Sequence, residues 1–193
     1  SLEQTEKARV NLEQAVALEP KFARAWLRLG EAAYDLKDYT RAAEAFTQGY
    51  ELMPDPKPEI LYYSAVSWLL AEDGQKSMAL LTVLLRDFRS VALLDWYQAL
   101  VAAAVEADNT SDAWPLMENC LKDFESDPDS WFMAYQLAAS EEDFERAAVL
   151  FTVVGYLRPL KRDEFLQLGD LYAGSGVPLQ AARYYQQAVQ YPE

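Results

Sequence analysis

Small residues recur through this chain at a nearly constant spacing. Successive members of the series are separated by 34, 35, 36, 34 and 34 residues. The series consists of Ala8, Ala42, Ser77, Ala113, Ala147 and Ala181. A period of this length indicates stacked structural repeats, each of which buries its apolar face against its neighbours. This periodicity constrains the fold more strongly than any single motif in the sequence.

A large apolar side chain follows each small residue by four positions. These larger residues are Leu12, Phe46, Leu81, Met117, Phe151 and Tyr185. Residues four apart lie on the same face of an α-helix, so each small–large pair predicts a helix with a buried stripe. Pro20, Pro54 and Pro159 stand where three of these helices should end, because proline cannot continue a helix. We therefore expect an all-α chain.

Residues 25–54 contain the most specific pattern, AWLRLGEAAYDLKDYTRAAEAFTQGYELMP. This segment resembles the tetratricopeptide repeat, whose pattern is W-x2-L-G-x2-Y, then A-x3-F, then P. The chain departs from the pattern at Ala33, where tyrosine is usual, and carries Tyr34 beside it. The resemblance implies a right-handed α-α superhelix, a solenoid of about five and a half helical hairpins.

The resemblance extends over the whole chain and implies a single solenoid domain, residues 1–193. Residues 1–20 match the second helix of a truncated repeat, so we expect the sequence to be a fragment of a longer protein. The five repeats are residues 23–54, 58–89, 91–125, 128–159 and 162–193. We expect Asp38 to cap the helix that follows it, and residues 109–111 (Asn-Thr-Ser) to supply the turn and the cap of a later helix.

The chain is strongly acidic, with 31 acids, 17 bases and a net charge of −14. This balance argues against nucleic acid as a partner, because lysine and arginine supply most of the affinity for phosphates. Between residues 90 and 145 there are 13 acids and one base, Lys122. Two interpretations fit this stretch: a solvated acidic surface, or attraction of a basic partner. No apolar run is long enough to span a membrane, so we expect no membrane insertion.

The sequence shows no constellation of residues that would support catalysis. Histidine is absent, which removes the commonest general base and the commonest nitrogen ligand of zinc. The single cysteine, Cys120, belongs to the apolar series, so we expect a buried structural thiol. The run Glu141-Glu142-Asp143 falls in a predicted turn, where capping and solvation explain it. We therefore expect no enzymatic activity, no cofactor and no metal site.

The resemblance implies that the first helix of each hairpin lines a concave groove that binds a segment of another protein. The residues predicted to line this groove are Leu27, Glu31, Tyr34, Tyr62, Val66, Leu69, Gln98, Val105, Asp129, Phe132, Gln136, Asp163, Leu166 and Asp170. Some family members capture a chaperone C-terminus with a lysine–asparagine clamp. The matching positions hold Leu27, Glu31, Val66, Gln98 and Ala102. The clamp is absent, and we do not expect chaperone-tail capture.

The predicted groove combines apolar residues with acids, so the expected partner segment has an apolar face and basic residues. Asp129 and Asp163 stand with Glu59 and Asp95 near helix starts. Two roles are open for these acids: they could compensate the helix dipole, or they could steer a basic ligand toward the groove.

The predicted function is a non-enzymatic protein–protein interaction scaffold or adaptor. The alternative is a structural module that self-associates and takes no peptide ligand. The last repeat, LGDLYAGSGVPLQAARYYQQAV, is similar to repeats in bacterial envelope proteins. That similarity favours the bacterial periplasm or envelope over the cytoplasm.

Overall fold

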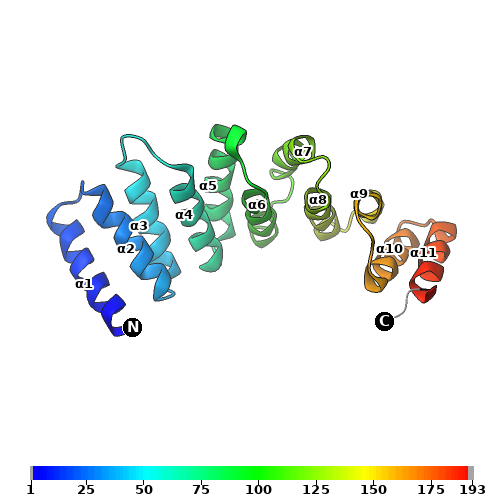
Figure 1. The fold of residues 1–193 in the computed structure, drawn as a ribbon, viewed down its shortest axis with the longest axis horizontal. Coiled ribbons are helices and arrows are strands. Elements are labelled where there is room, and N and C mark those ends of the chain that lie inside the picture. Colours follow the sequence, from blue (N-terminus) through cyan, green and yellow to red (C-terminus); the bar gives the residue numbers. More distant parts are fainter. Residues whose placement is uncertain (1, 191–193) are drawn as a thin grey trace. The chain divides into compact units, whose positions relative to one another are not determined.

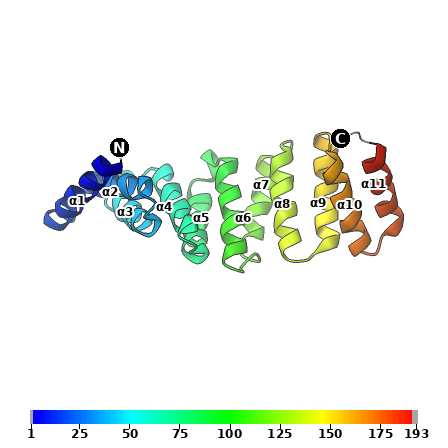
Figure 2. The ribbon, with the colours of Figure 1, turned by 90° about the horizontal axis from the view of Figure 1, so that it is seen from below.

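The computed structural model describes residues 2–190, and these residues are almost entirely helical (Figures 1 and 2). The helices are α1 (Leu2–Leu18), α2 (Ala23–Asp35), α3 (Tyr39–Glu51), α4 (Pro58–Leu70), α5 (Gly74–Asp87), α6 (Leu94–Glu106), α7 (Trp114–Asp123), α8 (Pro128–Ser140), α9 (Phe144–Leu157), α10 (Arg162–Gly174) and α11 (Pro178–Gln190). A short 3-10 turn covers Arg89–Val91, and no strand occurs within the described residues. The all-α prediction is confirmed. The predicted repeats include Ser1 and residues 191–193, which lie outside the described residues.

The chain forms two compact units that divide between Asn109 and Thr110. The first unit contains α1 to α6, and the second contains α7 to α11. Within each unit, helices that follow one another in the sequence pack side by side as antiparallel neighbours (Figure 1). The dividing point falls inside the segment 91–125 that the sequence pattern assigns to one repeat. A single solenoid domain over residues 1–193 stays a prediction.

The recurring small residues lie at the centre of the packing, as their spacing predicts. Ala42, Ser77, Ala113 and Ala147 are fully buried. Ala8 is exposed, because it lines an open pocket between α1 and α2. Cys120 is also fully buried, and burial is the main reason why the pKa of its thiol rises to about 12. The predicted burial of this thiol is confirmed.

Each turn that joins the two helices of a hairpin contains one residue with a left-handed backbone. The five residues are Lys37, Glu72, Asp108, Glu142 and Gly176, with φ between 50° and 76°. In the fourth turn the Asp143 amide donates to the carbonyl oxygen of Ala138 at 3.1 Å, and the Glu142 amide donates to that of Ala139. This is a Schellman-type helix end, which usually holds glycine at the left-handed position. Only the last of the five turns has a glycine there.

Three of the second helices begin with an aspartate cap. The carboxylates of Asp38, Asp73 and Asp143 accept hydrogen bonds from backbone amides three residues further on, at 3.0–3.2 Å. The cap predicted at Asp38 is therefore confirmed. The cap predicted within residues 109–111 is wrong. Helix α7 begins later, its N-cap is Ala113, and no side chain caps it.

One ion pair ties the loop after α9 to the start of α10 in the second unit. The Arg158 guanidinium donates to both carboxylate oxygens of Glu164, at 2.7 and 2.9 Å. The Lys161 amide donates to the same carboxylate at 2.8 Å. The hydrogen bond from Arg158 is the main reason why the pKa of Glu164 lies below its ordinary value of 4.5. The two side chains are 29% and 17% exposed, so solvent screens this pair less than a surface pair.

The left-handed turns predict a stabilising substitution. Replacing Glu142 by glycine removes the strain of a side chain at positive φ, which outweighs the extra disorder of glycine in the unfolded chain. We expect Glu142→Gly to stabilise the protein by about 0.5–1 kcal/mol in urea unfolding followed by circular dichroism. Glu142→Gln is the matched control, because it removes the charge and keeps the strain. An equal gain in both variants would show that charge, and not backbone strain, limits stability here.

The Arg158–Glu164 pair predicts a pH-dependent contribution to stability. Because the folded pKa of Glu164 is lowered, its contribution is present above the unfolded pKa and is lost as the pH falls through the folded pKa. We expect Glu164→Gln to cost about 1–2 kcal/mol at pH 7. The difference from the parent should narrow as the pH falls below about 4, and it should vanish below the lowered folded pKa of Glu164. Glu3→Gln, which breaks the exposed Glu3–Lys7 pair on α1, should change nothing measurable at either pH. A constant difference across the whole pH range would contradict the assignment.

Candidate functional site

A pocket of about 430 Å³ opens between α2 and α4 in the first unit. Its lining consists of Leu27, Glu31, Tyr34 and Asp35 from α2, Phe46 from α3, and Ile60 and Tyr63 from α4. Three of the residues predicted to line the groove, Leu27, Glu31 and Tyr34, are therefore brought together. The pocket is of a size that accommodates one or two side chains of a bound segment.

The base of the pocket depends on two glycines that let the helices of the first hairpin approach each other. A Cβ atom on Gly30 would lie 2.7 Å from Cδ1 of Phe46. The Phe46 ring can therefore lie directly against α2. The Leu27 side chain lies over Gly49 in the same way. Leu27 and Ile60 pack against a buried cluster that includes Phe46, so the base is apolar and tightly filled.

Two tyrosines form the walls, and both are exposed while their rings are held in place. Tyr34 on α2 is 38% exposed, and its ring makes an edge contact with Tyr39 at 5.5 Å between centroids. Tyr63 on α4 is 52% exposed, and its ring lies 5.9 Å from that of Phe46. Exposed aromatic rings that have few free rotamers are efficient contact surfaces, because little side-chain entropy is lost on binding.

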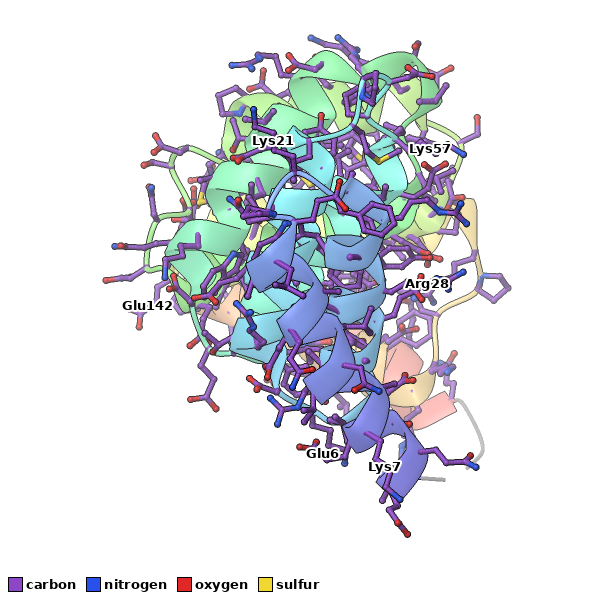
Figure 3. All side chains as sticks on the ribbon, turned by 90° about the vertical axis from the view of Figure 1, so that its left-hand side faces the viewer. Glu6, Lys7, Lys21, Arg28, Lys57 and Glu142 are labelled. Carbon is purple, nitrogen blue, oxygen red and sulfur yellow. The ribbon has the colours of Figure 1, made fainter. Side chains whose placement is uncertain are left out.

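The charged rim of the pocket is acidic. Glu31 and Asp35 stand one helical turn apart on α2, and both are exposed. Glu31 forms an ion pair with Arg28, which lies on the flank of α2 and points to solvent (Figure 3). Within the described residues Asp35 has no ion-pair partner. The pocket therefore combines an apolar base, two tyrosine walls and one carboxylate that lacks a counter-ion.

Tyr62 was predicted to line the groove, but it does not contribute to this pocket. Its ring stacks on that of Trp96 of α6 at 6.3 Å between centroids. Burial is the main reason why the pKa of Tyr62 is raised, and the carboxylate of Asp95 adds to the shift. Its neighbour Tyr63 faces the pocket in its place. The other predicted residues of the first unit lie outside the pocket: Val66 and Leu69 are half-buried on α4, and Gln98 and Val105 are exposed on α6.

The six predicted residues of the second unit lie on α8 and α10, namely Asp129, Phe132, Gln136, Asp163, Leu166 and Asp170. Phe132 is half-buried, and its ring makes an edge contact with the fully buried Phe151 at 5.7 Å. Asp170 accepts a hydrogen bond from the Tyr185 hydroxyl at 2.8 Å. The other four residues are exposed. Phe132 is therefore a packing residue as much as a surface residue.

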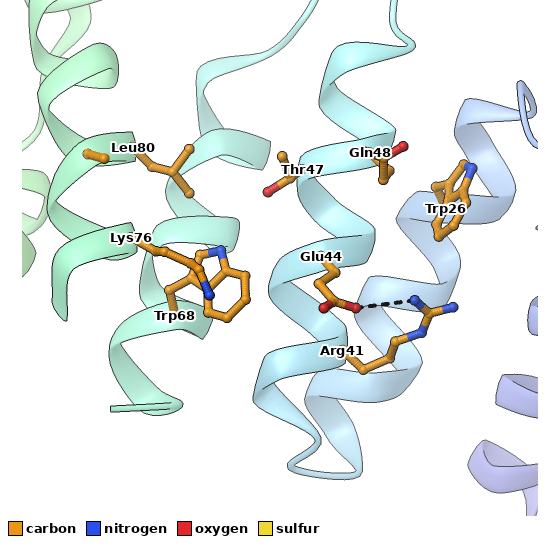
Figure 4. A pocket seen from close by; sticks show the side chains of 9 residues that line it. Trp26, Arg41, Glu44, Thr47, Gln48, Trp68, Lys76 and Leu80 are labelled. Atoms are coloured by element: carbon orange, nitrogen blue, oxygen red, sulfur yellow. Dashed lines mark hydrogen bonds and ion pairs between the residues drawn. The ribbon is translucent and has the colours of Figure 1, made fainter. Parts of the chain in front are cut away.

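A second pocket, of about 490 Å³, lies across the outer side of α3 (Figure 4). Trp26 and Trp68 stand on either side of this helix, and each ring has a cation near it. The guanidinium of Arg41 lies 5.6 Å from the centre of the Trp26 ring, and the Lys76 amine lies 3.9 Å from that of Trp68. Arg41 pairs with Glu44 and Lys76 with Asp73, at 3.4 and 2.8 Å. Both cations are already neutralised, which favours a structural role for them.

Within residues 2–190, no group of three or more cysteine, aspartate and glutamate side chains is arranged to hold a metal ion. None of the helices in that range combines the length and the apolar character needed to cross a membrane.

The first 56 residues match the family model of the tetratricopeptide repeat. A curated relative is the heat-shock protein cognate co-chaperone sgt12 of Aspergillus fumigatus, 46% identical over 48 residues. The match covers 25% of this chain and only 14% of the co-chaperone.

Solved structures resemble a much larger part of the chain. MamA residues 41–end from Desulfovibrio magneticus RS-1 superpose with a TM-score of 0.67 at 14% identity, covering 87% of this chain and 93% of MamA. YrrB, a tetratricopeptide protein with an unusual peptide-binding site, gives a TM-score of 0.66 at 17% identity, covering 93% and 91%. PilW, a type IV pilus biogenesis factor, gives 0.61 at 20% identity, covering 99% and 89%.

The described residues form an α-helical repeat scaffold in which stacked hairpins leave a pocket between neighbouring first helices. Residues 1–56 match the tetratricopeptide repeat by sequence, and the described residues share the fold of solved tetratricopeptide-repeat proteins such as YrrB.

Proposed function

We propose that this protein is a non-enzymatic adaptor that holds a segment of another protein in the pocket between α2 and α4. The observation that carries the proposal is the combination of an apolar base with two exposed tyrosines held by aromatic neighbours. Such a surface offers large contact area at low entropic cost, as aromatic anchors of interfaces do. YrrB, which shares this fold, has a peptide-binding site, and that is consistent with such a use of the scaffold.

The charge of the pocket favours a partner segment with an apolar face and basic residues. Glu31 and Asp35 lie at the rim, so an acidic segment would bring like charges together as water is removed. A basic residue would supply a counter-ion for Asp35. The predicted residues Tyr62 and Gln98, both in the first unit, extend this surface in the proposal, as secondary contacts.

Self-association is the second candidate, and exposed apolar residues of the second unit favour it. Tyr156 on α9 is 85% exposed, and Leu179 and Val189 on α11 are each 82% exposed. Large exposed side chains of this kind are common in contacts between copies of a chain. The envelope location inferred from the last repeat rests on sequence similarity alone and stays part of the proposal.

A displayed library of random peptides provides a direct test of the pocket. We expect the parent protein to enrich peptides whose binding is weakened by Tyr34→Ala and by Tyr63→Ala. Each change should cost about 1–2 kcal/mol or more, because each removes an aromatic anchor. The binding of synthetic copies of the enriched peptides would be measured by calorimetry. Phe132 is a poorer choice for truncation, because its loss would also disturb the packing around Phe151.

Tyr156→Ala is the matched control, since Tyr156 is an exposed tyrosine that lies outside the pocket. It should leave peptide binding unchanged. Two results would contradict the adaptor proposal. One is that no peptide is enriched, and the other is that both pocket variants bind the enriched peptides as tightly as the parent does. Light scattering over a range of protein concentrations tests the second candidate. A mass that rises with concentration in the parent and not in Tyr156→Ala would support self-association.

A further inference from the structure

We infer that the pocket between α2 and α4 receives an arginine side chain of the bound segment. This inference rests on the proposed function, because it names the residue that the pocket recognises. It depends on three features of the pocket: the apolar base, the two tyrosine rings and the carboxylates at the rim.

The base suits the long aliphatic stem of a cationic side chain. Leu27 and Ile60 line it together with Phe46, and none of the three carries a polar side-chain atom. Long cationic side chains place their methylene groups on apolar surface and keep the charged end at the polar boundary. At about 430 Å³ the pocket holds such a stem together with part of a neighbouring apolar residue.

The tyrosine rings are placed where a cation leaving the base would meet them. Tyr34 projects from α2 and Tyr63 from α4, so one ring stands on each helix that borders the opening. A guanidinium over the face of an aromatic ring is attracted by its quadrupole. The chain itself uses this interaction on the outer side of α3, where Arg41 covers Trp26.

The carboxylates complete the recognition of a cation. Asp35 is exposed and has no ion-pair partner within the described residues, so a ligand cation would be its first counter-ion. Glu31 is paired with Arg28, but both side chains are more than half exposed. A pair on an exposed surface contributes little and is readily exchanged for another partner. Arg28 is therefore the internal competitor of the incoming arginine.

Arginine fits these features better than lysine does. Its guanidinium is planar, stacks on aromatic rings and can donate two hydrogen bonds to one carboxylate. The ammonium of lysine is a compact and strongly hydrated charge, and it gains less from a ring face. The pocket should therefore bind arginine more tightly than lysine. A site that recognised only the positive charge would bind the two equally.

The experiment uses the peptides that the parent protein enriches from the displayed library. We expect most of them to contain arginine beside an apolar residue. For one such peptide, the arginine is replaced by lysine and, separately, by glutamine, and the three dissociation constants are measured by calorimetry. We expect the lysine peptide to bind several-fold more weakly and the glutamine peptide at least tenfold more weakly. Affinity of the arginine peptide should also fall more steeply with salt than that of the glutamine peptide.

A double-mutant cycle with Asp35→Asn assigns the effect to the pocket. In this variant the preference for arginine over glutamine should fall to a fewfold or less, while the glutamine peptide binds as it does to the parent. Asp55→Asn is the matched control, because it removes an exposed carboxylate in the loop after α3, outside the pocket lining. The control should keep the full preference.

The outcomes separate this inference from the proposed function. The inference about arginine is wrong if the enriched peptides lack arginine. It is also wrong if Asp35→Asn weakens the arginine and glutamine peptides equally. In both cases the adaptor proposal stands. If lysine binds as well as arginine, recognition is by charge alone, and the inference is again wrong. If neither Tyr34→Ala nor Tyr63→Ala weakens the binding of any enriched peptide, the adaptor proposal is wrong, and the inference about arginine is wrong with it.

Discussion

The close approach of the two helices in each hairpin is the constraint on which the rest of this structure depends. In the first hairpin, Gly30 leaves room for the Phe46 ring against α2, and Gly49 leaves room for Leu27. Ala42 lies fully buried between these contacts. If α2 and α3 stood further apart, Phe46 and Leu27 would no longer form one continuous apolar base. The pocket between α2 and α4 is thus a product of the same small residues that define the repeat.

The sequence predicts the parts of the fold that depend on local spacing. The series of small residues marks six helices, because five members lie within helices and Ala113 is the N-cap of α7. Four members of the series are fully buried. The aspartate cap at Asp38 follows from the same kind of local rule. The left-handed turns could not be found in this way, because four of the five positions hold lysine, glutamate or aspartate in place of glycine. There the hydrogen bonds of the Schellman turn impose the conformation on residues that do not favour it.

The candidate site could be predicted only in part, for a geometric reason. The spacing along α2 selected Leu27, Glu31 and Tyr34, and these three residues line the pocket. On α4 it selected Tyr62, whereas Tyr63 and Ile60 line the pocket. Adjacent residues on a helix point about 100° apart, and spacing alone does not show which neighbouring helix each one meets. Tyr62 turns to Trp96 because α6 packs beside α4. The position of α6 is information that the pattern of α4 does not contain.

The distribution of charge explains why the fold alone does not identify the ligand of this pocket. The fold fixes which positions of a first helix face the pocket, but it does not fix their charge. In this chain those positions hold Leu27, Glu31 and Asp35, and the cations Arg41 and Lys76 are engaged with tryptophan rings and acids on the outer side of α3. The pocket is therefore apolar and acidic, which disfavours an acidic or carboxylate-terminated ligand by like-charge repulsion. The similarity to a co-chaperone covers 48 residues and only 14% of that protein. Because these side chains face the pocket and do not form the buried core of the hairpin, the choice of ligand rests on a few residues.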